Sequence, residues 1–451
     1  MRKVEQSGTP TVARVSVIGT GYLGATHAVC MSELGFSAVG IDVDVAKVDR
    51  LNAGVVPFFE PGLEELLRKN LETGRLTFST SFEAAADADV HFLCVGTPQQ
   101  ADSGRADLSH LDAAVDRLLA AGPKPGALLV GKSTVPTGTA DRLRTLLTAR
   151  APGLRLAWNP EFLREGFAIA DTLRPDRLVF GVPPDDARVV EGILRAVYAS
   201  PIERGVPVVV CDFATAELVK VAANAFLATK ISFINAMAEI CEVAGGDVER
   251  LASALAYDAR IGGRFLQAGV GFGGGCLPKD IRAFQARADE LGVGQAVGFL
   301  REVDAINLRR RRRVADLTAA LLGGSVRGRA VAVLGAAFKP NSDDIRDSPA
   351  LDVAELLHAD GAVVTVYDPA AIPNAMRRNP RLLYAPSAVA AVREADIVLH
   401  LTEWAEFREI DPALLTPLAH NPIIVDGRNT LDVERWRAAG WTIHALGRPN
   451  V

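Results

Sequence analysis

Residues 14–24, RVSVIGTGYLG, decide the fold of this chain, because an apolar segment of strand length runs directly into a glycine-rich turn. Gly19 permits the tight turn, Gly21 lets the backbone approach a pyrophosphate, and Gly24 lets the following helix pack closely against the strand. The N-terminus of that helix offers free N–H groups and the positive end of its dipole to a phosphate. The stretch therefore predicts the first strand, turn and helix of a dinucleotide-binding domain.

An acidic residue follows the next strand. The apolar segment 38–41 ends directly before Asp42. A carboxylate at this position can accept hydrogen bonds from both ribose hydroxyls of a dinucleotide and would repel a 2′-phosphate. Asp42 therefore favours NAD over NADP. The alternative, a glycine-rich turn with an incidental aspartate, leaves this strand–turn–helix–strand context unexplained.

Apolar segments alternate with helical patterns from residue 13 to about 212, which is typical of a parallel sheet with crossover helices. The pattern predicts helices such as 22–34 and 62–70. It predicts strands at 14–18, 38–41, 90–95, 128–133, 156–158, 178–181 and 208–210. Alternation resumes later in the chain, with strands at 330–335, 363–367, 396–401 and 423–426.

Between these regions, residues 213–257 and 290–322 are predicted to form long helices around a glycine-dense loop, 261–280. The chain has 451 residues, enough for about three units. We therefore expect an α/β fold with two Rossmann-like doubly wound domains joined by long central helices, which favour a homodimer. The expected domains are 1–212 for NAD, 213–322 as connector with the cysteine loop, and 323–451 for the substrate nucleotide.

Composition excludes several classes of protein. The chain has 49 Lys+Arg against 54 Asp+Glu, so its net charge of -5 gives no basic excess for nucleic acid. The one dense basic run, Arg309 to Arg313, is expected on a solvated face. The most apolar long stretch, 213–241, contains four charged residues, which argues against a membrane span. Five scattered cysteines without a CxxC pair indicate reduced thiols and no metal site. Because residues 1–12 have no apolar signal segment, we expect a cytoplasmic protein.

The second motif is GVGFGGGCLPKD, residues 269–280. Its five glycines allow the backbone to wrap closely around a ligand, at an entropic cost. Cys276 follows them, with Lys279 nearby and a helix expected beyond, a setting that favours a nucleophilic thiolate. Beside a dinucleotide site, such a thiol can capture an aldehyde as a thiohemiacetal, which loses hydride to give a thioester. The alternative is a small packing residue.

Two further motifs carry polar residues in apolar surroundings. Glu217, Lys220 and Asn224 share one helical face, which either turns to water or faces a site. The apolar sequence around Lys220 and Asn224 favours a site. Glu161 follows Asn-Pro after a predicted strand, where the loops of an α/β sheet present reacting groups. For its neighbour Arg164, simple surface solvation is the preferred interpretation.

These motifs together resemble the nucleotide-sugar 6-dehydrogenases, a family that oxidises UDP-glucose, GDP-mannose or UDP-N-acetylmannosamine. GTGYLG, FLCVGTP, GKSTVPTGT, NPEFLREG, GFGGGCLPKD, AFKPNSDDIRDSPAL and VDGRN occur in the family order and cover nearly the whole chain. The segment from Arg260 to Asp280 is most similar to the UDP-glucose branch. The resemblance implies NAD-dependent, four-electron oxidation of UDP-glucose to UDP-glucuronate through a cysteine thioester. The alternative is GDP-mannose with the same mechanism.

The resemblance also implies roles for individual residues. Cys276 matches the nucleophile, Lys220 and Asn224 the pair that binds sugar and stabilises oxyanions, and Asp280 a helper in proton transfer. Glu161 matches the acid/base of thioester hydrolysis, and Thr134 helps to hold a water. Implied cofactor contacts are Gly19, Gly21, Tyr22, Leu23, Gly24, Asp42, Lys47, Thr97, Thr134, Glu165, Lys279 and Arg346. Implied substrate contacts are Glu161, Phe162, Leu163, Glu165, Lys220, Asn224, Arg260, Phe265, Leu266, Gly269, Gly273, Phe338, Lys339 and Arg428.

One position departs from the family pattern. Many relatives have serine directly before the cysteine, where this chain has Gly275. A glycine there removes a possible hydrogen bond but keeps the backbone donors, so activity is expected to survive. A rival from another class is a non-catalytic NAD sensor, which has no need of Cys276, Lys220, Asn224 and Asp280 together. A third rival is a two-electron dehydrogenase of a simple hydroxy acid, which has no use for the cysteine loop.

Overall fold

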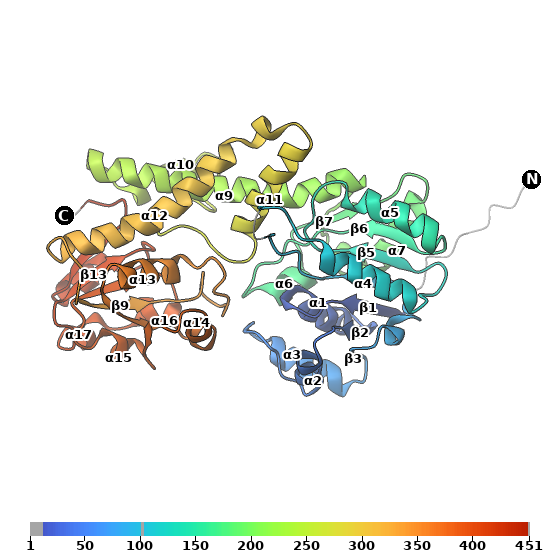
Figure 1. Ribbon diagram of the computed structural model, residues 1–451, viewed down its shortest axis with the longest axis horizontal. Coiled ribbons are helices and arrows are strands. Elements are labelled where there is room, and N and C mark those ends of the chain that lie inside the picture. Colours follow the sequence, from blue (N-terminus) through green and yellow to red (C-terminus); the bar gives the residue numbers. More distant parts are fainter. Residues whose placement is uncertain (1–11, 101–102, 450–451) are drawn as a thin grey trace, which may run out of the picture. The chain divides into compact units, whose positions relative to one another are not determined.

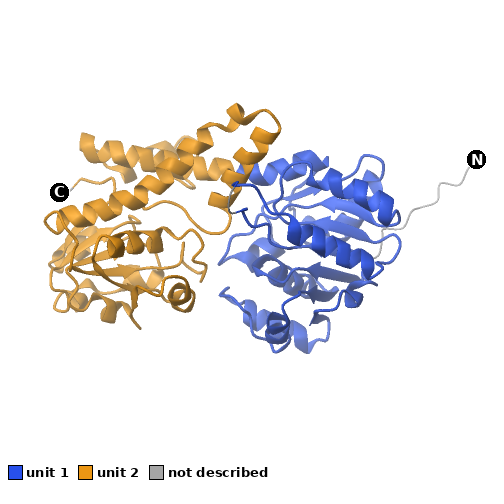
Figure 2. Ribbon diagram, viewed as in Figure 1, with its two compact units in different colours: residues 1–223 blue, residues 224–451 orange. Residues whose placement is uncertain are grey.

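The computed structural model describes residues 12–100 and 103–449, and the chain folds into two compact units, Met1–Ala223 and Asn224–Val451 (Figure 2). Residues 1–11, most of the segment on which the cytoplasmic expectation depends, lie outside the described residues. The three-domain division stays a prediction. A single long helix, α9 (Phe213–Ala244), begins in the first unit and ends in the second (Figure 1).

The first unit is built on an eight-stranded sheet in the order β3-β2-β1-β4-β5-β6-β7-β8, with helices on its faces (Figure 1). Its strands are β1 (Arg14–Ile18), β2 (Ser37–Ile41), β3 (Leu76–Ser79), β4 (Val90–Leu93), β5 (Leu128–Gly131), β6 (Arg155–Trp158), β7 (Leu178–Gly181) and β8 (Val208–Cys211). Its helices are α1 (Tyr22–Glu33), α2 (Val45–Asn52), α3 (Leu63–Glu72), η1 (Phe82–Ala85), α4 (Ser109–Ala120), α5 (Thr139–Arg150), α6 (Ala168–Leu173), α7 (Ala187–Val197) and α8 (Ala199–Glu203).

Two hydrophobic cores cover the two faces of this sheet, because successive side chains of a strand point to opposite faces. In β5, Leu128 and Val130 lie in one core and Leu129 in the other. All three are fully buried. The near-continuous apolar strands of the sequence are thus explained by burial on both sides.

The direction of one strand pair differs from the expectation of a parallel sheet. β6 and β7 pair antiparallel through Trp158 and Gly181, while β7 and β8 are parallel to each other. The last two strands therefore run opposite to the other six. An apolar segment of strand length carries no information about direction, which is why the sequence pattern missed this reversal. It also missed the short edge strand β3.

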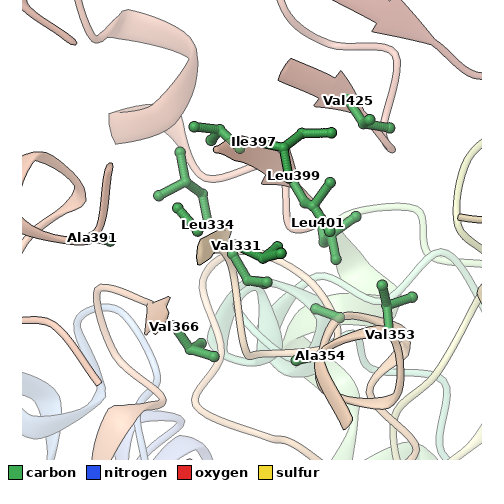
Figure 3. Close-up of a cluster of buried hydrophobic side chains, with 14 of the residues drawn as sticks. Val331, Leu334, Val353, Ala354, Val366, Ala391, Ile397, Leu399, Leu401 and Val425 are labelled. Carbon is green, nitrogen blue, oxygen red and sulfur yellow. The ribbon is translucent and has the colours of Figure 1, made fainter. Parts of the chain in front are cut away.

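The second unit contains a six-stranded parallel sheet in the order β11-β10-β9-β12-β13-β14. This order repeats that of β3-β2-β1-β4-β5-β6, so the expectation of two Rossmann-like sheets is confirmed. The strands are β9 (Ala330–Leu334), β10 (Val363–Tyr367), β11 (Leu383–Tyr384), β12 (Ile397–His400), β13 (Ile423–Asp426) and β14 (Thr442–Ala445). β11 and β14 were not expected. Figure 3 shows the core of this sheet, in which Val331 pairs with Ile397 and Leu399 with Val425 on neighbouring strands.

Helices make up the remainder of the second unit. They are α10 (Val248–Ala256), α11 (Leu277–Glu290), η2 (Gly294–Val297), α12 (Phe299–Leu321), α13 (Pro349–Ala359), α14 (Ile372–Arg378), α15 (Ala388–Val392), α16 (Ala405–Glu409), α17 (Pro412–Leu415) and α18 (Val433–Ala438). The expected helix 213–257 is two helices, broken at Gly245, which adopts a positive φ of 75°. The expected helix 290–322 begins only at Phe299.

The basic run on α12 does not lie on a solvated face, contrary to the expectation. Arg310 and Arg311 are 0% and 2% exposed, while Arg309 and Arg312 are exposed. A helix turns consecutive residues to different sides, so one charge run serves both an interior and a surface.

By length and composition α9 could cross a membrane, although 44% of its most apolar window is buried inside the protein. An internal helix of a folded domain passes the same test.

Candidate active site

The glycine-rich turn at the end of β1 has the expected geometry. Gly19 adopts φ +88°, and a Cβ at Gly24 would overlap the carbonyl oxygen of Gly19. A Cβ at Gly21 would meet only open space, and as the N-cap residue of α1 Gly21 makes no side-chain cap hydrogen bond. The turn therefore leaves room and backbone donors for a pyrophosphate, so the residues present fit a dinucleotide.

Asp42 lies at the end of β2, 8% exposed, beside this turn. Its carboxylate accepts hydrogen bonds from the backbone N–H of Thr20 at 2.8 Å and from Nζ of Lys47 at 2.9 Å. Burial raises the pKa of Asp42, but hydrogen bonds from Lys47, Asp44 and Thr20 outweigh it and hold the pKa below its usual value. Asp42, predicted to bind the ribose, and Lys47, a predicted NAD contact, are thus held together as an ion pair.

The loops after β4 and β5 meet through two predicted cofactor residues. The hydroxyl of Thr97 donates to the carbonyl oxygen of Thr134 at 2.7 Å, and the neighbouring Ser133 donates to Val95 at 2.7 Å. These bonds tie two adjacent strand ends together at the carboxyl edge of the sheet, where ligands of α/β proteins bind.

Glu60 is a residue that the sequence analysis missed. It is 7% exposed, and its carboxylate accepts hydrogen bonds from the hydroxyl of Tyr22 and from the N–H groups of Gly166 at 2.6 Å and Ala168 at 2.7 Å. It therefore links the start of α1 to the segment that follows Glu161. Burial and the Glu60 hydrogen bond raise the pKa of Tyr22. Nothing in the sequence around Glu60 indicates this contact.

Glu161 lies in the loop after β6, with its carboxylate bound to the backbone N–H of Leu163. Burial raises the pKa of Glu161, while the ammonium groups of Lys220 and Lys132 oppose that shift. Lys220 itself is 8% exposed, and its Nζ lies 5.5 Å from the ring centre of Phe162. The first unit thus gathers Glu161, Phe162 and Lys220. Arg164 pairs with Asp171 and is more than half exposed, as expected.

The polar face predicted on α9 is only partly a site. Glu217 does not share the surroundings of Lys220, because its carboxylate accepts the N–H groups of Gly138 and Ala140 at 2.7 Å each. It caps the N-terminus of α5, as an anion there should. Lys220 and Asn224 remain on the predicted face, one helical turn apart.

In the second unit, Asp280 is hydrogen-bonded to two other predicted site residues. It is 1% exposed and accepts hydrogen bonds from Nδ2 of Asn224 at 2.6 Å and from Nζ of Lys279 at 2.6 Å. Asp280 lies in the first turn of α11. Cys276, which is exposed, is the N-cap residue of the same helix. Cys276 is therefore at the end of α11 that carries the positive end of the helix dipole.

The glycines before Cys276 lie against protein rather than only around open space. A Cβ at Gly273 would overlap the carbonyl oxygen of Asp347, one at Gly274 would come within 2.8 Å of the Phe338 ring, and one at Gly275 would overlap the guanidinium of Arg346. Close packing therefore explains why these positions carry no side chain, and contact of their backbone with a ligand stays a prediction.

Helix α12 holds this loop from the other side. Asn307 accepts the N–H of Phe272 at 2.8 Å and donates to its carbonyl oxygen at 3.0 Å. Arg311 donates to the same oxygen at 2.9 Å, and Arg310 donates to Gly269 at 3.2 Å. None of the three was predicted, because Arg310 and Arg311 lie in a basic run that is typical of an exposed surface and Asn307 lies just before that run.

Other predicted substrate residues differ in whether they contact further predicted residues. Arg428 donates to the carbonyl oxygens of Gly271 at 2.9 Å and Phe338 at 3.3 Å, so it joins the cysteine loop to the loop after β9. Nζ of Lys339 lies 5.5 Å from the Phe338 ring centre. Arg260, in contrast, pairs with its neighbour Asp258, and its side chain is 89% exposed. Among the described residues, no predicted substrate contact bonds to that side chain.

Three family descriptions match the chain in order. Residues 13–202 match the NAD binding domain of the UDP-glucose/GDP-mannose dehydrogenase family, 214–309 its central domain and 332–433 its UDP binding domain. The chain belongs to this family. The NAD binding domain of this dehydrogenase contains the glycine-rich turn and Asp42, and the UDP binding domain contains Phe338, Lys339 and Arg428.

Individual relatives cover nearly the whole dehydrogenase. The chain is 41% identical to UDP-glucose 6-dehydrogenase YwqF of Bacillus subtilis over 97% of its own length and 98% of that protein. A UDP-glucose dehydrogenase structure from Pyrobaculum islandicum is similar with a TM-score of 0.86 and 37% identity, covering 96% of this chain and 99% of that one. A GDP-mannose dehydrogenase structure from Pseudomonas aeruginosa gives 0.52 and 28%, covering 96% and 99%.

Proposed function

We propose that this dehydrogenase oxidises UDP-glucose to UDP-glucuronate with two NAD, through a covalent intermediate on Cys276. The observation that supports it best is an exposed cysteine at the N-terminus of α11, four residues before a buried aspartate that bonds Asn224. In an NAD-dependent oxidation of an alcohol, a nucleophilic thiol has a use where the aldehyde is held for a second oxidation.

The proposed mechanism assigns one task to each residue. Bound NAD supplies a hydride acceptor for each oxidation. Lys220 and Asp280, with a water, take the proton of the primary alcohol. The Cys276 thiolate adds to the aldehyde carbon to form a thiohemiacetal, and Asn224 and Lys220 stabilise its negative oxygen. Glu161 takes a proton from the water that cleaves the thioester, Thr134 helps to hold that water, and the thiolate is released.

The alternative substrate is GDP-mannose, which would leave the mechanism unchanged. The higher identity to UDP-glucose dehydrogenases, 41% and 37% against 28%, favours UDP-glucose. Since residues 332–433 match a UDP binding domain, uridine recognition is the expectation for the second sheet.

The deciding measurement is the amount of NADH formed per UDP-glucose consumed, with limiting sugar and excess NAD. Two NADH per sugar are expected. One would mean that the aldehyde leaves the enzyme and that Cys276 has another role. None, together with activity on GDP-mannose, would change the substrate only.

Replacement of the nucleophile gives an independent test. Cys276→Ser should stop multiple turnover or trap an ester, because an alkoxide is a poorer leaving group than a thiolate. Intact-protein mass spectrometry after incubation with both substrates would detect the ester. Full turnover by this variant would refute the thioester route.

We also propose a homodimer formed through α9. Phe226, Phe233 and Ile240 repeat every seven residues on this helix and are 67%, 47% and 57% exposed. A seven-residue apolar repeat is the pattern of a helix that packs along a second helix. A second copy of α9 would cover these side chains. The cytoplasm stays the predicted location.

A further inference from the structure

A buried lysine near the proposed acid/base has no part in the mechanism above. Lys132 directly follows β5 and is 6% exposed. Its Nζ donates to Oδ1 of Asn159 at 3.0 Å and lies 3.4 Å from the hydroxyl oxygen of Tyr198. In the described part of the chain no carboxylate forms an ion pair with it. Burial of an ammonium group that is hydrogen-bonded only to neutral groups costs free energy, which indicates that the charge has a function.

The partner of Lys132 leads directly to Glu161. Asn159 is 2% exposed and stands two residues before Glu161, separated from it by a proline. Its Oδ1 accepts from Lys132 and also from Tyr198 at 2.6 Å, while its Nδ2 donates to Val179 at 2.9 Å. Asn159 is thus fixed to the strands on both sides of β6. Because proline restricts both its own φ and the residue before it, an anchor at Asn159 limits where the Glu161 backbone can lie.

The charges around Glu161 are few. Lys220 and Lys132 oppose the rise in its pKa that burial causes, and Asp171 adds to that rise.

Around Lys132 the facing groups are Tyr198, Glu161 and Cys94. Burial, with a contribution from Lys132, lowers the pKa of His27 well below its usual value, so that ring is neutral. Burial raises the pKa of Cys94 to about 12, so this thiol is neutral as well. Of the groups that interact electrostatically with the Lys132 ammonium, Glu161 is therefore the one that can carry a negative charge.

We propose that Lys132 is a positioning residue for Glu161, which fixes the Asn-Pro-Glu turn through Asn159 and keeps the Glu161 carboxylate ionised for thioester hydrolysis. In that step the water oxygen bonds to the acyl carbon, the carbon–sulfur bond breaks, the Cys276 thiolate leaves and Glu161 takes the proton. This proposal rests on the role proposed for Glu161. If Lys132 only filled space in the core, removal of its charge would not affect the ionisation of that carboxyl group.

The test compares variants by the decay of the acyl-enzyme in a single turnover at several pH values. Lys132→Met keeps the apolar stem and removes the charge. The acid limb of its pH profile should move up by about one pH unit, so its acyl-enzyme should decay up to about tenfold more slowly on that limb. The sign follows because loss of a cation raises the pKa of Glu161, and ionised Glu161 is then present only at higher pH. The first hydride transfer should be nearly unchanged.

Two further variants separate charge from structure. Tyr198→Phe removes the other donor to Asn159 without changing any charge, so its acid limb should stay in place. Lys132→Gln removes the charge but keeps an N–H donor for Asn159, so its acid limb should move up as in Lys132→Met. If Lys132→Met does not fold, this variant decides the question. An unmoved acid limb in both charge variants, or an equal shift in Tyr198→Phe, would overturn the proposal.

The wild-type enzyme keeps this result distinct from a failure of the proposed function. If it forms no acyl-enzyme, the thioester route itself is wrong. If it forms one and releases two NADH, while Lys132→Met decays with the wild-type pH profile, only the role of Lys132 is refuted.

Discussion

Gly275 shows how one missing side chain determines the position of another. A Cβ at this position would overlap the guanidinium of Arg346. Arg346 pairs with Asp344, and its side chain is 63% exposed. The guanidinium is the flexible end of a long side chain, so it can move at little cost. The departure from serine therefore lets Arg346 lie over the loop that carries Cys276.

Gly275→Ser should displace Arg346 rather than unfold the protein. We expect the free energy of unfolding to change by less than about 1 kcal/mol, because the displaced group is exposed. The KM for NAD should rise by up to roughly tenfold, since Arg346 is a predicted cofactor contact and a charge-assisted hydrogen bond contributes about that much. Steady-state kinetics with varied NAD measure the effect.

Gly275→Ala is the matched control, because it adds the same Cβ without a hydroxyl group. Both variants should raise the KM for NAD if Arg346 is displaced by volume. An unchanged KM in both would contradict the assignment of Arg346 to the cofactor.

At the scale of an element, α12 acts as a clamp on the cysteine loop. Asn307, Arg310 and Arg311 lie three and four residues apart, so they share one face of the helix. Arg310 lies 3.8 Å from Glu239 and from Glu242, two carboxylates on α9. Burial lowers the pKa of Arg310 despite these carboxylates. Two buried charged side chains and one amide of this helix therefore hold a glycine-rich loop that has little rigidity of its own.

Removal of the amide should loosen this loop. Asn307→Ala leaves the buried N–H of Phe272 without its partner, while its carbonyl oxygen keeps Arg311. We expect a loss of about 1–3 kcal/mol in the free energy of unfolding, the usual cost of an unsatisfied buried polar group. The variant should also oxidise UDP-glucose more slowly at saturating substrate. Urea denaturation and kcat measure the two effects.

Arg312→Ala is the control on the same helix. Arg312 pairs with Asp360, and both side chains are nearly half exposed. Its loss should cost no more than about 0.5 kcal/mol. Equal losses in the two variants would show that α12 tolerates truncation alike on both faces and does not clamp the loop.

At the scale of the whole molecule, α9 links the two units along the chain and exposes apolar side chains. If it forms a dimer, Phe233→Glu should place a carboxylate in an apolar helix interface and shift the enzyme to the monomer. Light scattering at micromolar concentration measures the mass of both proteins. A monomeric wild-type protein at that concentration would refute the dimer.

Leu414→Glu is the control, because this side chain is 64% exposed on α17, away from the seven-residue repeat. It should leave the mass unchanged. Dissociation by both variants would mean that added charge, rather than the α9 repeat, controls the assembly.

The local pattern of the sequence determined which segments are strands and helices and where the glycine-rich turns lie. Strands such as β1, β7, β10 and β13 begin and end where their apolar segments do. Hydrophobic periodicity, glycine turns and the acidic end of β2 are properties of neighbouring residues, so they can be read without a fold. The family resemblance rests on the same local motifs, and the match to the family confirms it.

Tertiary structure alone decided which partners the polar residues have. Glu217 caps α5, Glu60 bonds Tyr22, and Arg310 and Arg311 are buried against a loop some 40 residues away in the chain. The reversal at β7 and the short strands β3, β11 and β14 also depend on neighbours in the sheets. A charged side chain has the same local pattern whether it faces water or a distant backbone. Only the packing of remote segments determines its environment, and with it the charges around Glu161.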